Sequence, residues 1–419
     1  MMRRAIPTIH HILFFVVFFL SSTQLGKHFF LSFSYLSGVR VDYLAPTIYL
    51  IDLVILSLAI LNLHSIKKML DSQRTLYILA LLALTIPFAL VMPIAFVAYL
   101  RIVEMIVLFF LVKDYLSRTK GYGILILFTS LTLAALVQLG VAGMQFIEKH
   151  SLNGAFYYLG ERYMTLSTPG IAKASLNGIE FLRPYGTFSH PNSLGGFYLL
   201  LSFFALTFPV NNKAQSLIQP LRFILFTLST LLVFFSFSKT AILTYCFLMV
   251  VWLVKTQFYK RCTLCFTARM TVLFFVSLLF IQAQGDLFSI AKRIELSRNA
   301  LEIIKQYPIT GVGLGNYVIA QAQFQTQHFN FINQPVHNAY LLLLSEVGLL
   351  VGGILLFELA QLFKKNRALS VFLFCFLSVG ITALFDHYWL TLIQNLTILM
   401  IVFGAIQNII EQEEANEAR

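Results

Sequence analysis

Charged side chains are scarce in this chain of 419 residues. Asp, Glu, Lys and Arg together make up 11% of the sequence, whereas a soluble globular protein carries roughly 25%. Hydrophobic residues make up 58%, so most of the surface must face something other than water. The alternation of apolar and polar residues that marks a membrane β-barrel is also missing from runs such as 12–20 and 123–137. These deficits favour an all-α polytopic membrane protein.

Features that mark a metal or redox centre are equally sparse. Of the four cysteines, Cys246 and Cys375 lie in apolar runs, and Cys262 and Cys265 form one Cys-x-x-Cys pair in a basic loop. One such pair is a weak metal or redox signal. No Asp-x-Asp sequence occurs, and no His, Cys and Asp cluster has metal-ligand spacing along the chain. We therefore predict no metal and no cofactor.

Apolar runs of about 17–25 residues, each long enough to cross a bilayer core of roughly 30 Å as a helix, recur along the sequence. Helices are required because lipid offers no partner for an unpaired backbone N–H or C=O group. The sequence predicts about twelve transmembrane helices, near residues 6–24, 44–63, 75–93, 94–116, 122–147, 193–210, 221–238, 240–257, 270–284, 337–361, 368–386 and 389–409.

The formal net charge is +12, and basic residues crowd into short connections between the apolar runs. Pairs such as Lys67 with Lys68 and Lys364 with Lys365 fall where the positive-inside rule predicts cytoplasmic loops. With the N-terminus inside, both termini are cytoplasmic. The expected location is the cytoplasmic (inner) membrane, with membrane lipids as partners and no nucleic acid.

Two long, less apolar segments interrupt the short connections, and both fall on the non-cytoplasmic side. Loops of this length in a compact domain are usually functional. In the second, Leu287, Ile290, Ile294, Leu301 and Ile304 recur at helical spacing, which predicts an amphipathic helix on the outer membrane surface. The expected organisation is transmembrane helices over 1–147, an extracytoplasmic loop over 148–192, transmembrane helices over 193–284, a large extracytoplasmic loop over 285–336, transmembrane helices over 337–410 and a frayed, acidic cytoplasmic tail over 411–419.

The first long loop ends in FLRPYGTFSHPNSLGGFYLL, which places two polar side chains where a span begins. Pro191 and Asn192 are typical of a helix start, so Arg183 and His190 are expected at the outer interface. An arginine there either binds an anionic ligand or reaches up to the lipid headgroups. The residues alone leave both interpretations open.

A second cation, Lys239 in FFSFSKTAIL, lies in a hairpin too short to be a true loop. The hairpin is expected at the outer boundary, where topology does not favour cations, so we predict a functional role for Lys239. The glycines of GVGLGNY follow no strand, and a turn is therefore favoured over a phosphate-binding loop.

Two further spans carry titratable groups at their expected outer ends. His337 and Asn338 stand at the start of the tenth span, with Glu346 about two turns deeper as a helix-packing or supporting group. In FDHYWL, Asp386 and His387 reach the same side.

Tyr388 and Trp389 follow directly and are typical of an interfacial aromatic belt. Elsewhere, Arg101 and Glu104 lie three positions apart on one expected helix, and we interpret them as a structural intramembrane ion pair.

Several cations and a histidine thus converge on one face, where carboxylates are few. Such a site suits an anionic ligand, such as a pyrophosphate, without a metal. Arginine and lysine stabilise developing phosphate charge by their placement alone. A neutral histidine can accept a proton near pH 7.

At these residues the sequence resembles a known family, the O-antigen ligase and O-antigen polymerase superfamily. Four separated motifs within about residues 180–360 carry the resemblance and occur in the family's order. They are RPYGTFSHPNSLGGFYLL, SFSKTAIL, RIELSRNALEIIKQYPITGVGLGNY and PVHNAYLLLLSEVGLLVGG. The spans before residue 180 match the family only in their hydrophobic character.

The resemblance implies a GT-C-like membrane glycosyltransferase that uses an undecaprenyl-pyrophosphate-linked glycan outside the cytoplasm. Its ligase branch is metal-independent and inverts the anomeric centre. Arg183 matches the arginine that contacts the donor pyrophosphate, and His337 matches the histidine proposed to activate the acceptor hydroxyl. Lys239 stands where the family more often has arginine, which keeps the charge but loses the bidentate fork. Arg293 matches a basic position before the glycine turn.

The function expected from the resemblance is therefore transfer of polysaccharide to an acceptor hydroxyl as a ligase. Supporting roles are expected for His190, Asn338, Glu346 and Asp386. The alternatives are a polysaccharide polymerase of the same superfamily and a transporter for the lipid-linked glycan. The acceptor, whether glycan, lipid or protein, is left open by the sequence.

Overall fold

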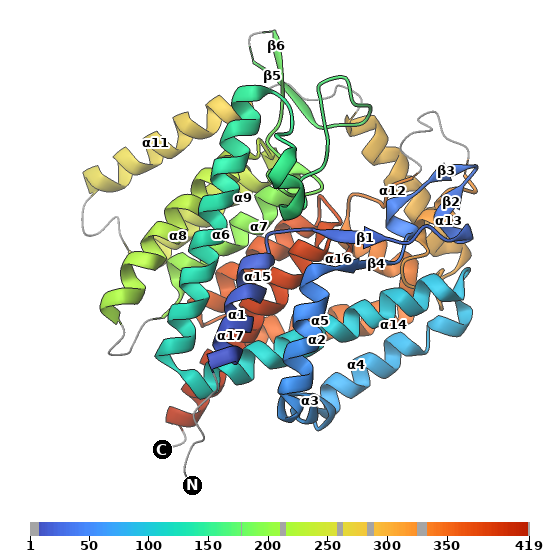
Figure 1. Ribbon diagram of the computed structural model, residues 1–419, viewed down its shortest axis with the longest axis horizontal. Helices are drawn as coiled ribbons and strands as arrows, with labels where there is room; N and C mark the ends of the chain where they lie inside the picture. The colour runs from blue at the N-terminus through green and yellow to red at the C-terminus, as the bar shows by residue number, and fades with distance from the viewer. Residues whose placement is uncertain are drawn as a thin grey trace.

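The computed structural model describes residues 8–176, 178–209, 215–257, 263–282, 289–324 and 333–417. Helices dominate this part of the chain and pack into one bundle (Figure 1). They are α1 (Thr8–Leu20), α2 (Leu50–Leu61), α3 (Leu63–Leu70), α4 (Gln73–Ala83), α5 (Met92–Thr119), α6 (Gly121–Glu148), α7 (Pro191–Thr207), α8 (Gln215–Phe235), α9 (Lys239–Lys255), α11 (Thr263–Ile281), α12 (Ser289–Gln306), α13 (Tyr317–Gln321), α14 (Ala339–Asn366), α15 (Ser370–Ala383), α16 (Tyr388–Thr391) and α17 (Ile393–Glu417).

The apolar helices agree with an integral membrane protein, although not all are long enough to span a bilayer alone. Each of the twelve expected spans overlaps a helix. By length and composition, five described helices can cross a membrane: α5, α6, most of α8, α14 and α17. A sixth is added if α2 and α3, bent by 87° at their junction, form one broken span. The number twelve therefore stays a prediction.

Helix α7 lies in the core of the bundle, in contact with α8, α9, α15 and α17. Nearly all of its residues are buried, as expected for a helix that is apolar on every side. Two small residues allow this packing. A Cβ atom on Gly195 would lie 2.7 Å from the Ser236 hydroxyl, and one on Gly196 would lie 2.2 Å from that of Tyr388.

The first residue of α7 is Pro191, as the sequence predicts, since proline fits the first helical position. Its N-cap, His190, therefore stands at the start of the most buried helix. Because most of α7 is buried, packing along the helix holds its N-terminus in place for the polar residues around it.

The described strands form short two-stranded sheets. Strand β1 (Gly26–His28) pairs with β4 (Thr47–Tyr49), β2 (Tyr35–Leu36) with β3 (Val39–Arg40), and β5 (Lys173–Leu176) with β6 (Ile179–Leu182), all antiparallel. The 3-10 helices are η1 (Ser32–Ser34), η2 (Asp42–Leu44), η3 (Ile86–Phe88) and η4 (Gly154–Leu159). In Figure 1, the β5–β6 hairpin lies at the end of the molecule opposite to the start of α1 and the end of α17.

The expected glycine turn and a break in α14 are packed against each other. Gly311, Gly313 and Gly315 all have positive φ, which favours glycine and confirms a turn. The Gly313 N–H donates to the Glu346 carbonyl at 2.8 Å. Within α14, Gly348 has φ 77°, and a Cβ there would lie 2.1 Å from the Ile309 carbonyl oxygen.

The amphipathic segment forms α12, of which Leu287 falls outside the described residues. One face, with Leu296, Ala300 and Ile303, is buried, and α12 contacts α14. Ile290 and Ile294 remain exposed. The helix is confirmed, and its contact with the membrane surface stays a prediction.

The expected ion pair inside the bundle is confirmed and has a third member. Arg101 lies 2.5 Å from Glu104 and 2.6 Å from Asp52, and it also donates to the Thr47 carbonyl at 2.9 Å. Asp52 in turn accepts from the Tyr49 N–H at 2.9 Å. This network ties the segment before α2 to α5, which supports a structural role.

Two expectations are wrong. Tyr388 and Trp389 are buried, at 3% and 2% exposure, because Tyr388 packs over Gly196 and the Trp389 indole donates to the Thr382 hydroxyl at 2.9 Å. The acidic tail is also helical as far as Glu417. Its Glu411 carboxylate lies 2.8 Å from the Lys113 ammonium, which holds the end of α17 to α5.

Candidate active site

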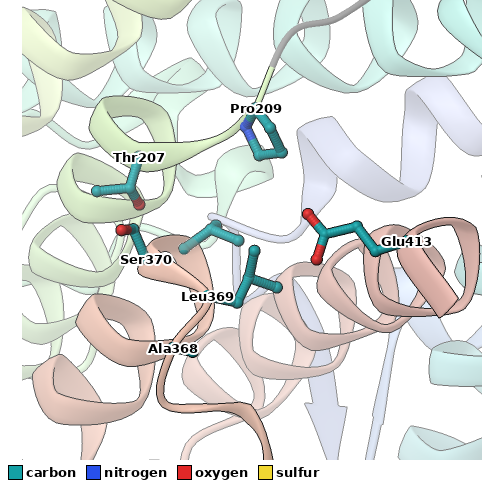
Figure 2. A pocket seen from close by; sticks show the side chains of 7 residues that line it. Thr207, Pro209, Ala368, Leu369, Ser370 and Glu413 are labelled. Atoms are coloured by element: carbon teal, nitrogen blue, oxygen red, sulfur yellow. The ribbon is translucent and has the colours of Figure 1, made fainter. Parts of the chain in front are cut away.

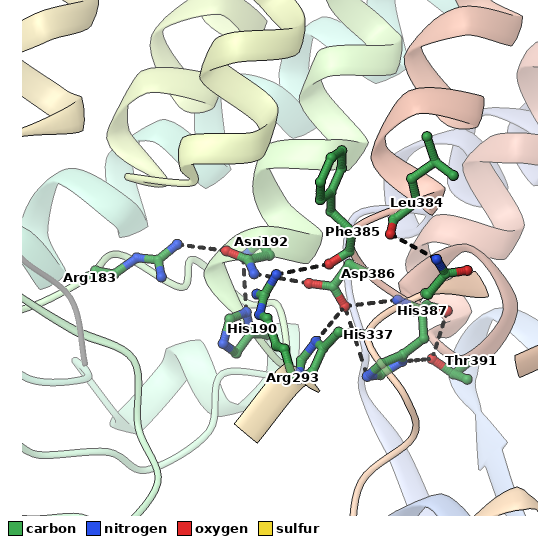
Figure 3. A network of polar contacts seen from close by, with 11 residues as sticks. Arg183, His190, Asn192, Arg293, His337, Leu384, Phe385, Asp386, His387 and Thr391 are labelled. Atoms are coloured by element: carbon green, nitrogen blue, oxygen red, sulfur yellow. Dashed lines mark hydrogen bonds and ion pairs between the residues drawn. The ribbon is translucent and has the colours of Figure 1, made fainter. Parts of the chain in front are cut away.

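A buried carboxylate, Asp386, lies between α15 and α16 at the centre of a polar network (Figure 3). Its Oδ1 lies 3.4 Å from His337 Nδ1 and accepts from the His387 backbone N–H at 2.9 Å. Its Oδ2 accepts from the Asn192 side-chain amide at 2.9 Å. Burial alone would raise the pKa of Asp386, but the adjacent His337 side chain, followed by the His387 and His190 rings, holds that pKa well below its usual range. Asp386 is therefore a carboxylate at neutral pH.

Arg183 joins this network through Asn192 instead of reaching away from the protein. Its guanidinium donates to Asn192 Oδ1 at 2.8 Å and twice to the Ser236 carbonyl, at 3.2 and 3.0 Å. Ser236 lies in the hairpin between α8 and α9. Burial and the nearby Arg293 charge lower the pKa of Arg183 to about 10, so the group remains a cation at pH 7. The geometry favours the ligand-binding interpretation over lipid contact.

His190 acts as the N-cap of α7. Its Nδ1 accepts a hydrogen bond from the Asn192 N–H at 3.1 Å, so this nitrogen carries no proton. Burial, followed by the Arg183 charge, lowers the pKa of His190 to about 3. A neutral His190 thus supports Asn192, which holds both Arg183 and Asp386.

His337 is held by the start of α14. The next residue, Asn338, is the N-cap, and its Oδ1 accepts from the N–H groups of Tyr340 and Leu341 at 3.0 and 2.9 Å. Its amide also donates to the Leu384 carbonyl at 3.1 Å. Asn338 therefore fixes the distance between the start of α14 and the segment that carries Asp386.

His387 is a neutral partner beneath Asp386. The Thr391 hydroxyl donates to the His387 carbonyl at 3.2 Å and so accepts from His387 Nδ1 at 2.7 Å. Burial lowers the pKa of His387 to about 4, against the opposing effect of Asp386. Its ring lies 5.4 Å from the ring of His337, centre to centre.

The remaining expected cations approach the network from two other elements. Arg293, on α12, donates to the Phe385 carbonyl at 3.1 Å, next to Asp386. Lys239 is exposed at the first position of α9, directly after its N-cap Ser238. It therefore shares a hairpin with Ser236, the carbonyl partner of Arg183.

Glu346 lies apart from the network. Its carboxylate is hydrogen-bonded to the backbone N–H groups of Gly315 and Tyr317. The structure thus places it on the glycine turn, in agreement with the packing role.

A segment without a distinctive motif, between α1 and α2, closes one side of the network. The Tyr43 ring, in η2, lies 5.6 Å from the His387 ring. Its neighbour Asp42 lies 3.7 Å from Arg162 of the first long loop. No sequence motif marks Tyr43, and its proximity to His387 comes from the fold.

An apolar cavity adjoins the anchor of Arg183. It has a volume of about 230 Å³ and is lined by Phe146, Phe235, Phe237, Leu279 and Phe280. Phe237 has φ 50°, an unusual conformation for a bulky residue that the surrounding packing must hold in place. Because Phe237 follows Ser236, the cavity begins one residue from the Arg183 contact.

A second cavity, of about 430 Å³, lies at the other end of α7 and away from this network (Figure 2). It is lined by Thr207, Pro209, Ala368, Leu369, Ser370, Val371 and Glu413. The network residues are absent from its lining.

Comparison with protein families identifies the segment that carries part of this site. Residues 224–357 match the family model described as O-antigen ligase. This segment, less than half of the chain, is similar to the O-antigen ligase family. The match supports the superfamily that the motifs predict and a membrane enzyme of the O-antigen ligase or polymerase type. A search of curated proteins finds no significant match.

The matched segment holds only part of the network. Lys239, Arg293 and His337 lie within the matched residues, whereas Arg183 and Asp386 lie on either side of them. The structure brings these last two to the matched segment through Ser236 and His337.

The spacing of residues along the sequence did not predict one cluster of possible metal ligands. His337, Asp386 and His387 each offer one ligand atom, and these three atoms lie within 4.8 Å of one another. His337 is 49 positions before Asp386, so no short motif could reveal the group.

Proposed function

We propose that the chain is a polysaccharide ligase that acts on the non-cytoplasmic face of the inner membrane. It transfers a glycan from undecaprenyl pyrophosphate to an acceptor hydroxyl. The contact that carries this proposal is the one between His337 and Asp386, which Asn192 links to the Arg183 cation (Figure 3). The O-antigen ligase match supports a glycosyl-transfer reaction.

His337 acts as the general base. When His337 Nδ1–H points to the Asp386 carboxylate, Nε2 keeps its lone pair and can accept the acceptor's hydroxyl proton. The acceptor oxygen then attacks the anomeric carbon as the bond from that carbon to the pyrophosphate oxygen breaks. The electron pair leaves with the pyrophosphate, and attack from the opposite face inverts the anomeric centre.

Arg183, Lys239 and Arg293 balance the charge that develops on the leaving pyrophosphate. Cations fixed before the reaction stabilise such charge without reorganisation. Because pyrophosphate is a good leaving group, these side chains can serve the reaction without a metal. The proposed enzyme is therefore a metal-independent, inverting glycosyltransferase.

The polyprenyl chain of the donor lies against the phenylalanine-lined cavity. Its apolar lining suits a hydrocarbon chain, since burying apolar surface is favourable. Its position beside Ser236 and Arg183 lets one donor reach both features. The twelve-span arrangement belongs to the same proposal, because it places the β5–β6 end outside the cytoplasm.

A polymerase of the same superfamily would use the same residues with a growing glycan as acceptor. A transporter would want polar residues near the bilayer midplane, and the Arg101 network, closed by Asp52 and Glu104, is the observation that favours that alternative.

One assay separates these functions: purified full-length protein in liposomes with a lipid-linked polysaccharide donor and a separate acceptor. The ligase predicts a covalent product in which the complete polysaccharide is joined to that acceptor. Extension of one lipid-linked glycan by another would show a polymerase. Movement of donor across the bilayer without a covalent product would overturn the enzyme.

A further inference from the structure

The side chains of His337, Asp386 and His387 form a cluster with the composition of a transition-metal site. Two imidazoles and a carboxylate are ligands that Zn²⁺ accepts, at about 2.0–2.2 Å from the ion. The three ligand atoms lie within 4.8 Å of one another. His337 Nδ1 lies 3.4 Å, and His387 Nε2 3.9 Å, from Asp386 Oδ1.

The hydrogen bonds of His387 leave a lone pair directed at this cluster. Thr391 donates its hydroxyl proton to the His387 carbonyl, so His387 Nδ1 must be the donor in its bond to Thr391. In a neutral imidazole the other nitrogen, Nε2, is then an acceptor. Nε2 faces the Asp386 carboxylate at 3.9 Å, which is too far for a hydrogen bond. Two electron-rich atoms face each other, and a cation between them would satisfy both.

The surroundings hold the ligands as a metal site requires. Ligating histidines usually donate their other ring nitrogen to a partner that fixes the tautomer, and Thr391 does this for His387. Asn192 donates to the second oxygen of Asp386. Ligand atoms around a tetrahedral zinc ion lie about 3.4 Å apart for the bond lengths involved, so the separations, which are at most 4.8 Å, would contract by no more than about 1.4 Å to close the site.

Nearby positive charge limits the affinity. Arg293 donates to the Phe385 carbonyl, and Arg183 reaches Asp386 through Asn192. We therefore expect reversible binding: excess metal fills the site and a chelator empties it. A permanent structural ion is not expected.

We propose that His337 Nδ1, Asp386 Oδ1 and His387 Nε2 form an inhibitory site for Zn²⁺ and similar transition-metal ions. Metal at His337 Nδ1 takes the position of the proton shared with Asp386. The neutral ring then carries its proton on Nε2, the atom that the proposed reaction needs as a base. Metal binding and transfer exclude each other. The first half of this proposal, the binding half, is that the cluster binds a metal ion, and it follows from geometry alone. The second half, the inhibitory half, is that the metal blocks transfer, and it rests on the proposed function.

The binding half is tested on full-length protein in detergent, treated with a chelator and titrated with Co²⁺. Co²⁺ in excess should produce the visible absorption of Co²⁺ bound in a low-symmetry protein site, and Zn²⁺ should displace it. His387→Ala and Asp386→Asn should each weaken binding by at least about tenfold. His150→Ala, at an exposed histidine of the first long loop, is the matched control and should bind normally.

His387→Gln serves if the alanine variant does not fold, with gel-filtration behaviour as the check. No absorption in excess Co²⁺, or absorption unchanged in both His387→Gln and Asp386→Asn, would overturn the site.

The inhibitory half is tested by adding Zn²⁺ to the liposome transfer assay. Zn²⁺ should abolish transfer at the concentration that displaces Co²⁺, and a chelator should restore it. Full transfer with Zn²⁺ bound would overturn the inhibition. A protein that binds Co²⁺ but transfers no glycan without metal would keep the site and reject the proposed enzyme instead.

Discussion

At the scale of single residues, the candidate site depends on side chains that hold other side chains. Asn192 connects Arg183 to Asp386, and Asn338 joins the start of α14 to the Leu384 carbonyl. The sequence predicted the titratable members, because charge and histidine are conspicuous in an apolar chain. It could not identify Asn192 or Ser236 as their partners. An asparagine at a helix start has no feature that predicts its contact with Arg183. A backbone carbonyl in a hairpin likewise has none, and Ser236 lies 53 positions from Arg183.

Arg183 should not tolerate lysine. Its guanidinium donates to Asn192 and Ser236 at the same time, and a single ammonium cannot reproduce this planar fork. Because a hydrogen bond to a charged group contributes about 1.5–3 kcal/mol, Arg183→Lys should raise the KM for lipid-linked donor about tenfold or more. Arg162→Lys, at an exposed arginine 3.7 Å from Asp42, is the control. An unchanged donor KM in Arg183→Lys would remove this arginine from the site.

His190 should make the protein acid-sensitive. Its folded pKa of about 3 lies below the ordinary value of 6.5, so the unfolded chain binds a proton more readily than the folded one. Stability from this group is complete above pH 6.5 and is lost as the pH falls toward 3. At pH 5 the loss is on the order of 2 kcal/mol.

His190→Asn keeps an N-cap acceptor but cannot titrate there. The unfolding temperature in detergent should therefore fall less between pH 7.5 and 5 in this variant than in the parent, whereas His150→Asn should behave like the parent. An equal fall in both variants would contradict the assignment.

At the scale of elements, hydropathy predicted the helices because each must satisfy its own backbone in lipid. Helix positions followed from the sequence, but the surroundings of each helix did not. Tyr388 and Trp389 have the composition of an interfacial belt, yet the absence of a side chain at Gly196 lets Tyr388 pack inside. The strands between α1 and α2 are only two or three residues long, too short for a periodic pattern.

The break in α14 should be intolerant of a side chain. Gly348 has a positive φ, and a Cβ atom there would collide with the Ile309 carbonyl. Gly348→Ala should lower the unfolding temperature by several degrees and reduce transfer, because the glycine turn after α12 packs on this break. Gly353→Ala is a matched control in the same helix, where a Cβ meets no atom within 4 Å. It should be neutral or slightly stabilising, and equal effects of the two variants would contradict the packing argument.

At the scale of the whole molecule, the β5–β6 hairpin lies at the end opposite to the last turns of α17 (Figure 1). The sequence predicted this separation from the placement of lysine and arginine. It could not show how residues 21–49 cover the network, because Tyr43 meets His387 only in the folded chain.

The orientation can be measured in cells with single cysteines in a background lacking the four native ones. Ser167→Cys, on the exposed loop before β5, should react with a membrane-impermeant maleimide from outside the inner membrane. Gln73→Cys, at the start of α4, should react only after the membrane is permeabilised. The reverse pattern would place the candidate site in the cytoplasm and contradict the orientation.

The central claim is that His337, held by Asp386, removes the acceptor proton during glycan transfer. The most direct test is the transfer rate of purified His337→Ala in donor-loaded liposomes, with protein folding verified by gel filtration. The rate should fall at least about 100-fold, the usual contribution of a general base, and Asp386→Asn should also lose most activity. His150→Ala should transfer at the parent rate. Full transfer by folded His337→Ala would contradict the account.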